Sequence, residues 1–248
     1  MTNSPKQDQG TGPLSPPMEF LSACGELGIE FEAGDVGRLG EYLRLMLEAN
    51  RTMNLTAITD PTLGWIRHIQ DSLTLMPLLA DLPPGARVID VGSGGGCPGV
   101  PLAVAMPHLS FALLEATGKK AAFLESVAST IDLQNVTVLN GRAETFAAFK
   151  SPHREAYDVA VARAVGPLAV VAELTVPFVK MGGRALLIKG QKADAELDAA
   201  AGALRALNAV HAGTVDTPTG RIVVLEKRVA TPRTYPRRDG EPKRVPLR

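Results

Sequence analysis

The sequence has few cysteines, few aromatic residues and no net charge, and these absences exclude several classes of protein. Its 248 residues include two cysteines, Cys24 and Cys97, four histidines and 4% aromatic residues. Two cysteines are too few for a disulfide framework or a cysteine-rich metal cluster. No apolar run approaches the roughly 18–20 residues of a membrane span, and the N-terminus has no apolar signal-peptide stretch. We therefore expect a cytoplasmic protein with no membrane partner and no metal.

The charge balance is uneven along the chain, although the total of 26 basic and 26 acidic residues is neutral. Residues 227–248 hold eight basic and two acidic residues, a net charge of +6, which leaves −6 for residues 1–226. A block of like charge at one end of a chain is typical of an interaction tail. The neutral total therefore does not exclude a nucleic-acid partner.

Composition and hydrophobic spacing divide the chain into four segments. Residues 1–17 are rich in Pro, Gly, Ser and Thr and predict a disordered tail. Residues 18–80 show helical spacing and predict an N-terminal helical extension, which ends at the Pro83-Pro84-Gly85 break. Residues 81–228 form the main domain, and residues 229–248 form a basic C-terminal tail.

Within the main domain, short apolar runs alternate with helix-length segments. The runs predict strands at 87–91, 111–114, 136–139, 157–162, 185–189, 210–214 and 222–226, with helices near 99–107, 117–132, 143–149, 166–180 and 192–207. Strands that alternate with helices indicate an α/β fold with a mostly parallel sheet. Only a short turn separates the last two runs, so these strands must form an antiparallel hairpin. The fold class is therefore a mostly parallel seven-stranded sheet that ends in an antiparallel hairpin.

The strongest local signal is the glycine-rich loop at 90–99, which follows the first predicted strand. Five glycines in this loop permit positive φ angles and close approach of the backbone to a ligand. Ligands bind at the carboxyl ends of strands in open α/β sheets. The loop contains a GxGxxG pattern, which alone is a weak indication of a dinucleotide. Asp90 beside the loop favours a ligand with an ammonium group over one with a pyrophosphate.

Polar residues follow the next strands at the same edge of the sheet. Glu115 ends the second strand, where a carboxylate can accept hydrogen bonds from the ribose of any adenosine cofactor. The third strand leads into Arg142-Ala143-Glu144, and the fourth ends at Arg163. Because the carboxyl ends of parallel strands meet at one edge, we expect these residues to form one site.

These residues resemble the class I S-adenosylmethionine-dependent methyltransferases, and more closely the 16S ribosomal RNA guanine-N7 methyltransferase family, also called glucose-inhibited division protein B. The resemblance covers roughly residues 50–247. Its motifs are NLTAI at 54–58, RHIQDSL at 67–73, DVGSGGGCPG at 90–99, GKK at 118–120, RAE at 142–144, ARA at 162–164, KG at 189–190 and YPRR at 235–238. It implies a Rossmann-like fold, S-adenosyl-L-methionine as cofactor, and 16S ribosomal RNA or the small ribosomal subunit as partner.

The resemblance also implies the residues that line the cofactor site. They are Gly92, Cys97, Glu115, Ala143, Glu144 and Arg163. Cys97 departs from the family, which usually has Phe or Leu at this position. A thiol offers less apolar surface to a cofactor, so a contact through the backbone of Cys97 is the alternative.

The implied reaction needs no general base, because guanine N7 carries a lone pair and no proton. We accordingly expect catalysis by alignment of the reacting atoms, and the catalytic residues stay unassigned. His68, Asp71 and Lys189 are candidates for positioning the substrate. His68 and Asp71 share a helix face, so they fit a role in substrate positioning and a simple hydrogen bond on the helix surface equally well. Lys189 could contact phosphate or could equally be a solvated surface lysine.

Three other functions compete with this interpretation. The first is methylation of another RNA or of a small molecule. The second is a nicotinamide-dependent oxidoreductase, which the terminal hairpin and Asp90 disfavour. The third is an RNA-binding protein with a degenerate cofactor site, which Glu115 and the loop glycines disfavour.

Overall fold

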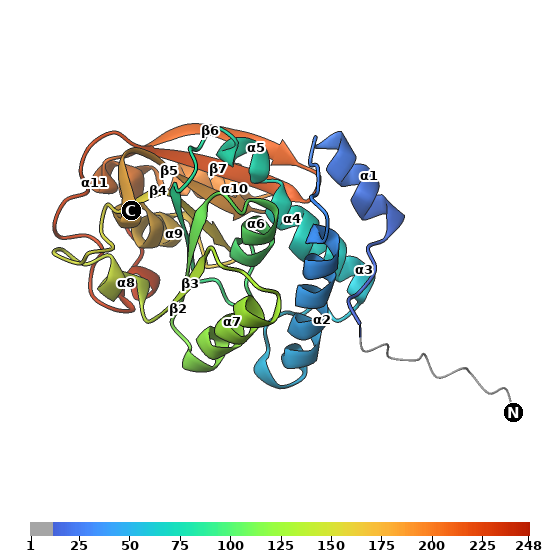
Figure 1. Ribbon diagram of the computed structural model, residues 1–248. Helices are drawn as coiled ribbons and strands as arrows, with labels where there is room; N and C mark the ends of the chain where they lie inside the picture. The colour runs from blue at the N-terminus through green and yellow to red at the C-terminus, as the bar shows by residue number, and fades with distance from the viewer. Residues whose placement is uncertain (1–11) are drawn as a thin grey trace, which may run out of the picture.

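A seven-stranded sheet forms the centre of the computed structural model, which describes residues 12–248 (Figure 1). The strand order is β3-β2-β1-β4-β5-β7-β6. The strands are β1 (Arg87–Val91), β2 (Ser110–Glu115), β3 (Val136–Asn140), β4 (Tyr157–Arg163), β5 (Val179–Lys189), β6 (Ala209–Thr217) and β7 (Gly220–Lys227). The first five are parallel, and β7 is antiparallel to both β5 and β6. The predicted fold class is confirmed, with all seven strands in the expected places.

Alternation along the strands builds a separate apolar core on each face of the sheet. In β1, Val88 packs with α6 (Gly99–Ala105) and α7 (Gly118–Thr130), whereas Ile89 packs with α9 (Leu168–Thr175) on the opposite face. The second face also carries α11 (Ala201–Leu207), which follows α10 (Ala193–Ala199) after a break at Ala200. The single helix predicted for 192–207 is therefore two helices. The remaining elements of the main domain are α8 (Ala143–Phe146) and the short 3₁₀ helix η2 (Val176–Phe178).

The N-terminal extension is helical, as predicted, and it covers the first face of the sheet. Its elements are α1 (Met18–Glu26), α2 (Asp35–Met53), α3 (Pro61–Gly64), a π-helical turn η1 (Trp65–Gln70), α4 (Asp71–Leu73) and α5 (Met76–Leu79). The stretch from Pro61 to Leu73 is one continuous helix whose middle turn is π-helical. Such turns are frequent at functional sites, and nothing in the residue pattern predicted this one.

The start of the described chain lies along α2. The backbone N–H of Leu14 donates to the carbonyl of Gly40 at 3.3 Å, and a Cβ at Gly40 would lie 2.2 Å from the Leu14 carbonyl oxygen. Glycine is thus required at this close approach. Leu14 is therefore docked on α2, within the segment predicted as a disordered tail; the first eleven residues of that segment lie outside the described residues.

The C-terminal segment, residues 229–248, folds against the main domain and ends in α12 (Glu241–Arg244). The guanidinium of Arg237 binds the carboxylate of Glu173 on α9 at 2.6 Å, and the Glu173 side chain is fully buried. The segment predicted as a basic C-terminal tail is therefore docked on the main domain. A glutamate inside the apolar helix α9 needs a cation for burial, and Arg237 supplies it.

Candidate functional site

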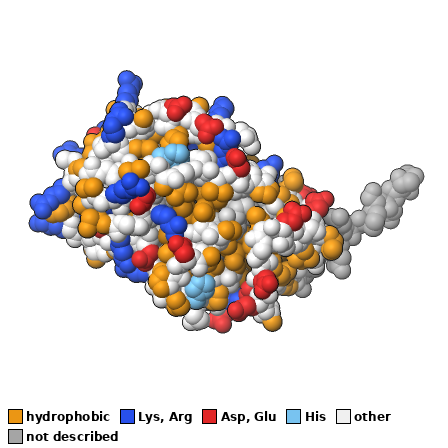
Figure 2. Space-filling model, turned by 90° about the horizontal axis from the view of Figure 1, so that it is seen from above, with side chains coloured by type: hydrophobic (Ala, Val, Ile, Leu, Met, Phe, Trp, Pro, Cys, Tyr) orange, Lys and Arg blue, Asp and Glu red, His pale blue; other side chains and the backbone are white. Residues whose placement is uncertain are grey.

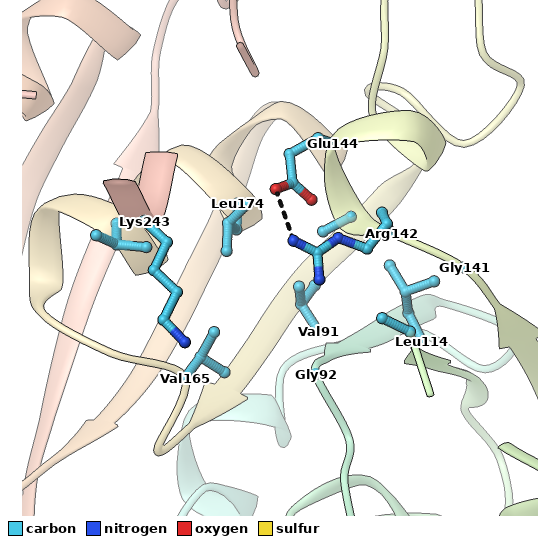
Figure 3. Close-up of a pocket in the computed structure, with 12 residues that line it drawn as sticks. Val91, Gly92, Leu114, Gly141, Arg142, Glu144, Val165, Leu174 and Lys243 are labelled. Carbon is cyan, nitrogen blue, oxygen red and sulfur yellow. Dashed lines mark ion pairs between the residues drawn. The ribbon is translucent and has the colours of Figure 1, made fainter. Parts of the chain in front are cut away.

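A cavity opens at the carboxyl ends of β1, β2 and β3 (Figure 3). It encloses about 640 Å³ of atom-free space, including the part open to solvent. The lining residues are Val91, Gly92, Leu114, Ala116, Gly141, Arg142, Ala143, Glu144, Val165, Val170, Leu174 and Lys243.

The glycine-rich loop forms one wall of the cavity and needs its glycines for conformation and for space. Gly92 has φ of 78°, and a Cβ there would lie 3.0 Å from Val165. A Cβ at Gly99 would lie 2.3 Å from the buried side chain of Leu113. Two acidic side chains hold the loop: Asp90 accepts from the Gly99 N–H at 3.0 Å, and Glu115 accepts from the Gly94 N–H at 3.0 Å.

Asp90 is buried with only half of its hydrogen-bonding capacity used. Its Oδ2 binds the loop, whereas Oδ1 has no hydrogen-bond partner among residues 12–248. Burial raises the pKa of Asp90 to about 7, and the bond from Gly99 only partly opposes this shift. The unpaired oxygen beside the loop is an acceptor that a cationic ligand group would satisfy.

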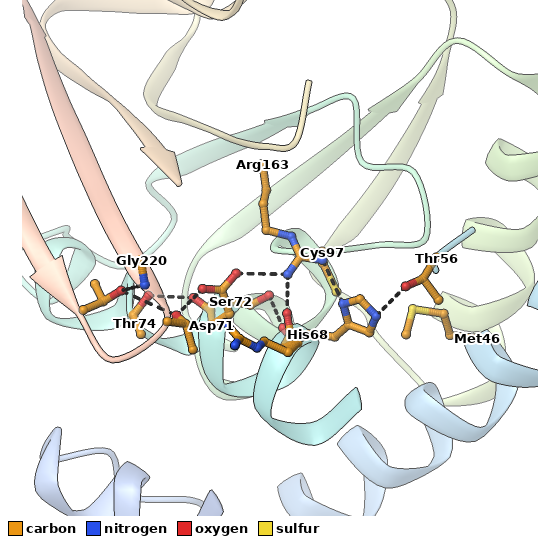
Figure 4. A network of polar contacts seen from close by, with 12 residues as sticks. Met46, Thr56, His68, Asp71, Ser72, Thr74, Cys97, Arg163 and Gly220 are labelled. Atoms are coloured by element: carbon orange, nitrogen blue, oxygen red, sulfur yellow. Dashed lines mark hydrogen bonds and ion pairs between the residues drawn. The ribbon is translucent and has the colours of Figure 1, made fainter. Parts of the chain in front are cut away.

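A second polar cluster lies at the carboxyl end of β4 and joins three of the predicted residues (Figure 4). The Nη1 of Arg163 lies 3.0 Å from Oδ2 of Asp71, and its Nη2 lies 3.0 Å from Nδ1 of His68. Arg163 also donates to the carbonyl of Arg67 at 2.6 Å. The second carboxylate oxygen of Asp71 accepts from the hydroxyl of Thr219 in the β6–β7 turn. The cluster therefore ties the N-terminal extension to two parts of the sheet.

The contacts of His68 determine its protonation. A guanidinium can only donate, so Nδ1 of His68 must accept from Arg163 and carry no proton. Its Nε2 lies 2.8 Å from the hydroxyl of Thr56 and carries the remaining proton. Burial, followed by the charge of Arg163, lowers the pKa of His68 to about 4. His68 is therefore neutral at pH 7 and serves as an acceptor for Arg163.

Cys97, in the glycine-rich loop, is buried. Its Sγ lies 3.0 Å from the hydroxyl of Tyr42 on α2, which also donates to the carbonyl of Gly95 at 2.9 Å. Burial raises the pKa of the Cys97 thiol. The side chain of Cys97 thus packs the loop against the N-terminal extension and does not line the cavity.

Lys189, at the end of β5, is already paired. Its ammonium lies 2.6 Å from the carboxylate of Glu196 and donates to the carbonyl of Gly166 at 2.7 Å. These contacts join β5 to α10 and to the loop after β4. No contact of Lys189 in this structure points to a substrate.

The structure thus separates the predicted site residues into two neighbouring groups. Gly92, Ala143 and Glu144 line the cavity, and Glu115 lies under its loop between the lining residues Leu114 and Ala116. Arg163, His68 and Asp71 form the cluster beside it. Lys243 also lines the cavity, which the sequence reasoning missed because it treated the C-terminal segment as separate. A single glutamate, Glu173, within an otherwise apolar predicted helix was the sequence feature that indicated a cationic partner for this helix.

Known proteins match this chain over nearly its whole length. A family model described as rRNA small subunit methyltransferase G (GidB) matches residues 36–221. The chain belongs to this family. The ribosomal RNA small subunit methyltransferase G of Sorangium cellulosum is 47% identical over 226 residues, which cover 91% of this chain and 94% of that protein. The protein of the same name from Moorella thermoacetica is 38% identical over 231 residues, 90% of this chain and 94% of that one. The resemblance to the methyltransferase G family is therefore confirmed.

Solved structures share the fold at low sequence identity. Cofactor-bound Rv0187 from MTB has a TM-score of 0.57 at 17% identity and covers 88% of this chain and 99% of that one. A mutant of MtNAS in complex with S-adenosylmethionine has a TM-score of 0.52 at 18% identity, covering 84% and 83%. These likenesses support the fold of this methyltransferase G family member. No helix within residues 12–248 has the length and apolarity to span a membrane.

Proposed function

We propose that this member of the methyltransferase G family transfers a methyl group from S-adenosylmethionine to N7 of a guanine in 16S ribosomal RNA of the small ribosomal subunit. The observation that carries the proposal is the cavity at the carboxyl ends of β1, β2 and β3, beside the glycine-rich loop. Family membership supplies the reaction class, and the cavity supplies the place for the cofactor.

The residues of the cavity fit the chemistry of the cofactor. Leu114, Ala116 and Leu174 offer apolar surface for a base. Glu144 offers carboxylate oxygens for hydroxyl or amino groups, and its Oε2 has no hydrogen-bond partner among residues 12–248. Glu115, under the loop, accepts from the backbone N–H groups of Gly94 and Thr117 and so shapes the wall of the cavity. The unpaired Oδ1 of Asp90 suits an ammonium group next to the loop. A nicotinamide dinucleotide would instead place its pyrophosphate beside two carboxylates, which is unfavourable.

When bound, S-adenosylmethionine supplies a methyl group on a sulfonium, which is already an activated leaving group. Guanine N7 attacks through its lone pair and has no proton to lose, so no residue must act as a base. His68 is neutral, but its unprotonated Nδ1 already accepts a hydrogen bond from Arg163. The histidine is therefore not needed as a base, in keeping with this reaction. The chain contributes alignment of the two reacting partners and exclusion of water.

The Arg163 cluster is the part of the site that would position the RNA base. Its guanidinium is fixed by three acceptors on the helix from Pro61 to Leu73, so it is held rigidly at the edge of the sheet. A fixed cation at this edge provides electrostatic and geometric control over the base that enters. We assign Arg163, His68 and Asp71 this positioning role.

The test is methylation of small ribosomal subunits from cells that lack this protein. Incubation with purified protein and labelled S-adenosylmethionine should place one methyl group on N7 of one guanine, identified by mass spectrometry of the digested RNA. Calorimetry should show binding of S-adenosylmethionine and no binding of NADH. A methyl group on another atom, or binding of NADH alone, would overturn the proposal.

A further inference from the structure

Among the basic residues of the C-terminal segment, Arg237 and a group of three differ in a way that the sequence does not show. Arg237 is anchored in the protein through the buried Glu173. Arg238, Lys243 and Arg244 are exposed, and their side chains form no hydrogen bond or ion pair with any residue from 12 to 248. Arg237 therefore has a counter-ion, whereas Arg238, Lys243 and Arg244 have none among residues 12–248.

Several contacts hold the segment in place beside the cavity. The guanidinium of Arg154 donates to the carbonyls of Thr231 at 2.8 Å and Tyr235 at 2.6 Å. Further along, the backbone N–H of Gly240 donates to Glu144, a cavity residue, at 2.8 Å. The backbone of the segment is therefore held next to the cavity by the protein itself.

One cation of the segment and one from the loop after β3 lie at the cavity. Lys243 lines the cavity, and its side chain extends towards Val165 (Figure 3). Arg142 lines the same cavity, is half exposed and lies 3.6 Å from Glu144, too far for a hydrogen bond. Figure 2 shows Lys and Arg side chains gathered on its left half, the side on which the C-terminal segment lies in Figure 1.

We propose that Arg142, Arg238, Lys243 and Arg244 form a phosphate-binding edge that holds the RNA backbone next to the cofactor cavity. Arg238, Lys243 and Arg244 have no counter-ion among residues 12–248, and Arg142 is half exposed beside its one ion-pair partner, Glu144, so bound phosphates would neutralise charge that the protein leaves largely uncompensated. S-adenosylmethionine carries no phosphate to do so. Arg and Lys are the residues that bind RNA phosphates. This inference rests on the proposed function and identifies the surface through which the RNA is held.

The experiment compares two triple variants that remove the same charge. The test variant is Arg238→Gln, Lys243→Gln and Arg244→Gln. The control is Arg87→Gln, Lys180→Gln and Arg184→Gln. Arg87 begins β1, and the other two residues lie in β5 before its carboxyl end, away from the cavity. Binding of each full-length protein to small-subunit ribosomal RNA is measured over a range of salt concentrations, and S-adenosylmethionine binding is measured by calorimetry.

The test variant should bind RNA about tenfold more weakly at low salt, and its slope of log affinity against log salt should fall by about 2–3, since each phosphate contact contributes about 0.7–0.9. The control should keep both the wild-type slope and the wild-type cofactor affinity. An unchanged slope in the test variant would overturn the proposal. So would loss of cofactor binding with normal RNA binding, which would assign Lys243 to the cofactor. Failure of the wild-type protein to bind cofactor or methylate RNA would instead overturn the proposed function, because the RNA-binding comparison is independent of catalysis.

Discussion

Arg163 and Asp71 are 92 residues apart in sequence, yet their side chains form an ion pair of 3.0 Å between β4 and the N-terminal extension. The side chains are 18% and 10% exposed, so the pair is largely shielded from solvent. The same guanidinium satisfies His68 and the carbonyl of Arg67. One cation therefore holds the helical extension against the edge of the sheet where the site lies.

Replacement of Arg163 by alanine should destabilise the fold and abolish methyl transfer. The change leaves the shielded Asp71 without its cation, and breaking a buried pair in this way costs about 3–5 kcal/mol. Arg163→Lys should retain only part of the stability, because an ammonium keeps the positive charge but lacks the planar, forked geometry of the guanidinium. Urea unfolding and a methyl-transfer assay measure both effects. The matched control is Arg184→Ala, whose partner Asp81 is 68% exposed and for which about 0–1 kcal/mol is expected. Equal losses in the two variants would contradict the role of Arg163.

His68 should make the free energy of unfolding depend on pH between about 4 and 6.5. The unfolded chain binds a proton at His68 below its ordinary pKa of 6.5, whereas the folded chain resists protonation down to about 4. The stability that neutral His68 contributes is therefore fully present above pH 6.5 and is lost as the pH falls towards 4, by on the order of 2 kcal/mol. Unfolding of His68→Gln across this range should show a shallower slope than wild type. His108→Gln, at an exposed position, controls for loss of an imidazole. Parallel slopes for wild type and His68→Gln would refute this account.

Gly99→Ala should distort the glycine-rich loop. Its Cβ would lie 2.3 Å from the buried Leu113 and 2.8 Å from Oδ2 of Asp90, so the loop or the strand must move. Overpacking of this kind costs about 1–3 kcal/mol, and the displaced loop should weaken S-adenosylmethionine binding. Thermal unfolding and calorimetry measure the two effects. The control is Gly118→Ala at the start of α7, where the nearest atom lies 3.7 Å away and no loss is expected. Normal cofactor binding by Gly99→Ala would show that the close approach has no functional role.

Arg237→Ala should release the C-terminal segment. Glu173 would remain fully buried without a cation, at a cost of about 3–5 kcal/mol, and the segment should become sensitive to protease. The double variant Arg237→Leu and Glu173→Leu should recover much of the stability, because it removes both charges together. Limited proteolysis and urea unfolding measure these changes, with Arg228→Ala as the control because that arginine is 61% exposed. A protease-resistant segment in Arg237→Ala would mean that other contacts suffice to dock it.

Local pattern was sufficient to predict the strands, because alternation of buried side chains and the glycine and proline breaks are written into neighbouring residues. The glycine-rich loop and Glu115 were also predictable, since each follows a strand in sequence. The pairing of Arg163 with His68 and Asp71 was not, because it joins an extension and a sheet that share no local pattern. The π-helical turn at Trp65–Gln70 likewise left no mark in the residue spacing.

The sequence by itself determined the order of the elements and the edge of the sheet at which a ligand binds, because a parallel sheet gathers the carboxyl ends of its strands on one side. Only the tertiary structure decided which charged side chains are paired inside the protein and which face solvent. Arg237 and Arg238 are neighbours of identical chemistry, yet one neutralises the buried Glu173 and the other is exposed. Burial creates this difference, because a charge removed from water requires a partner, and that partner lies 64 residues away in the sequence.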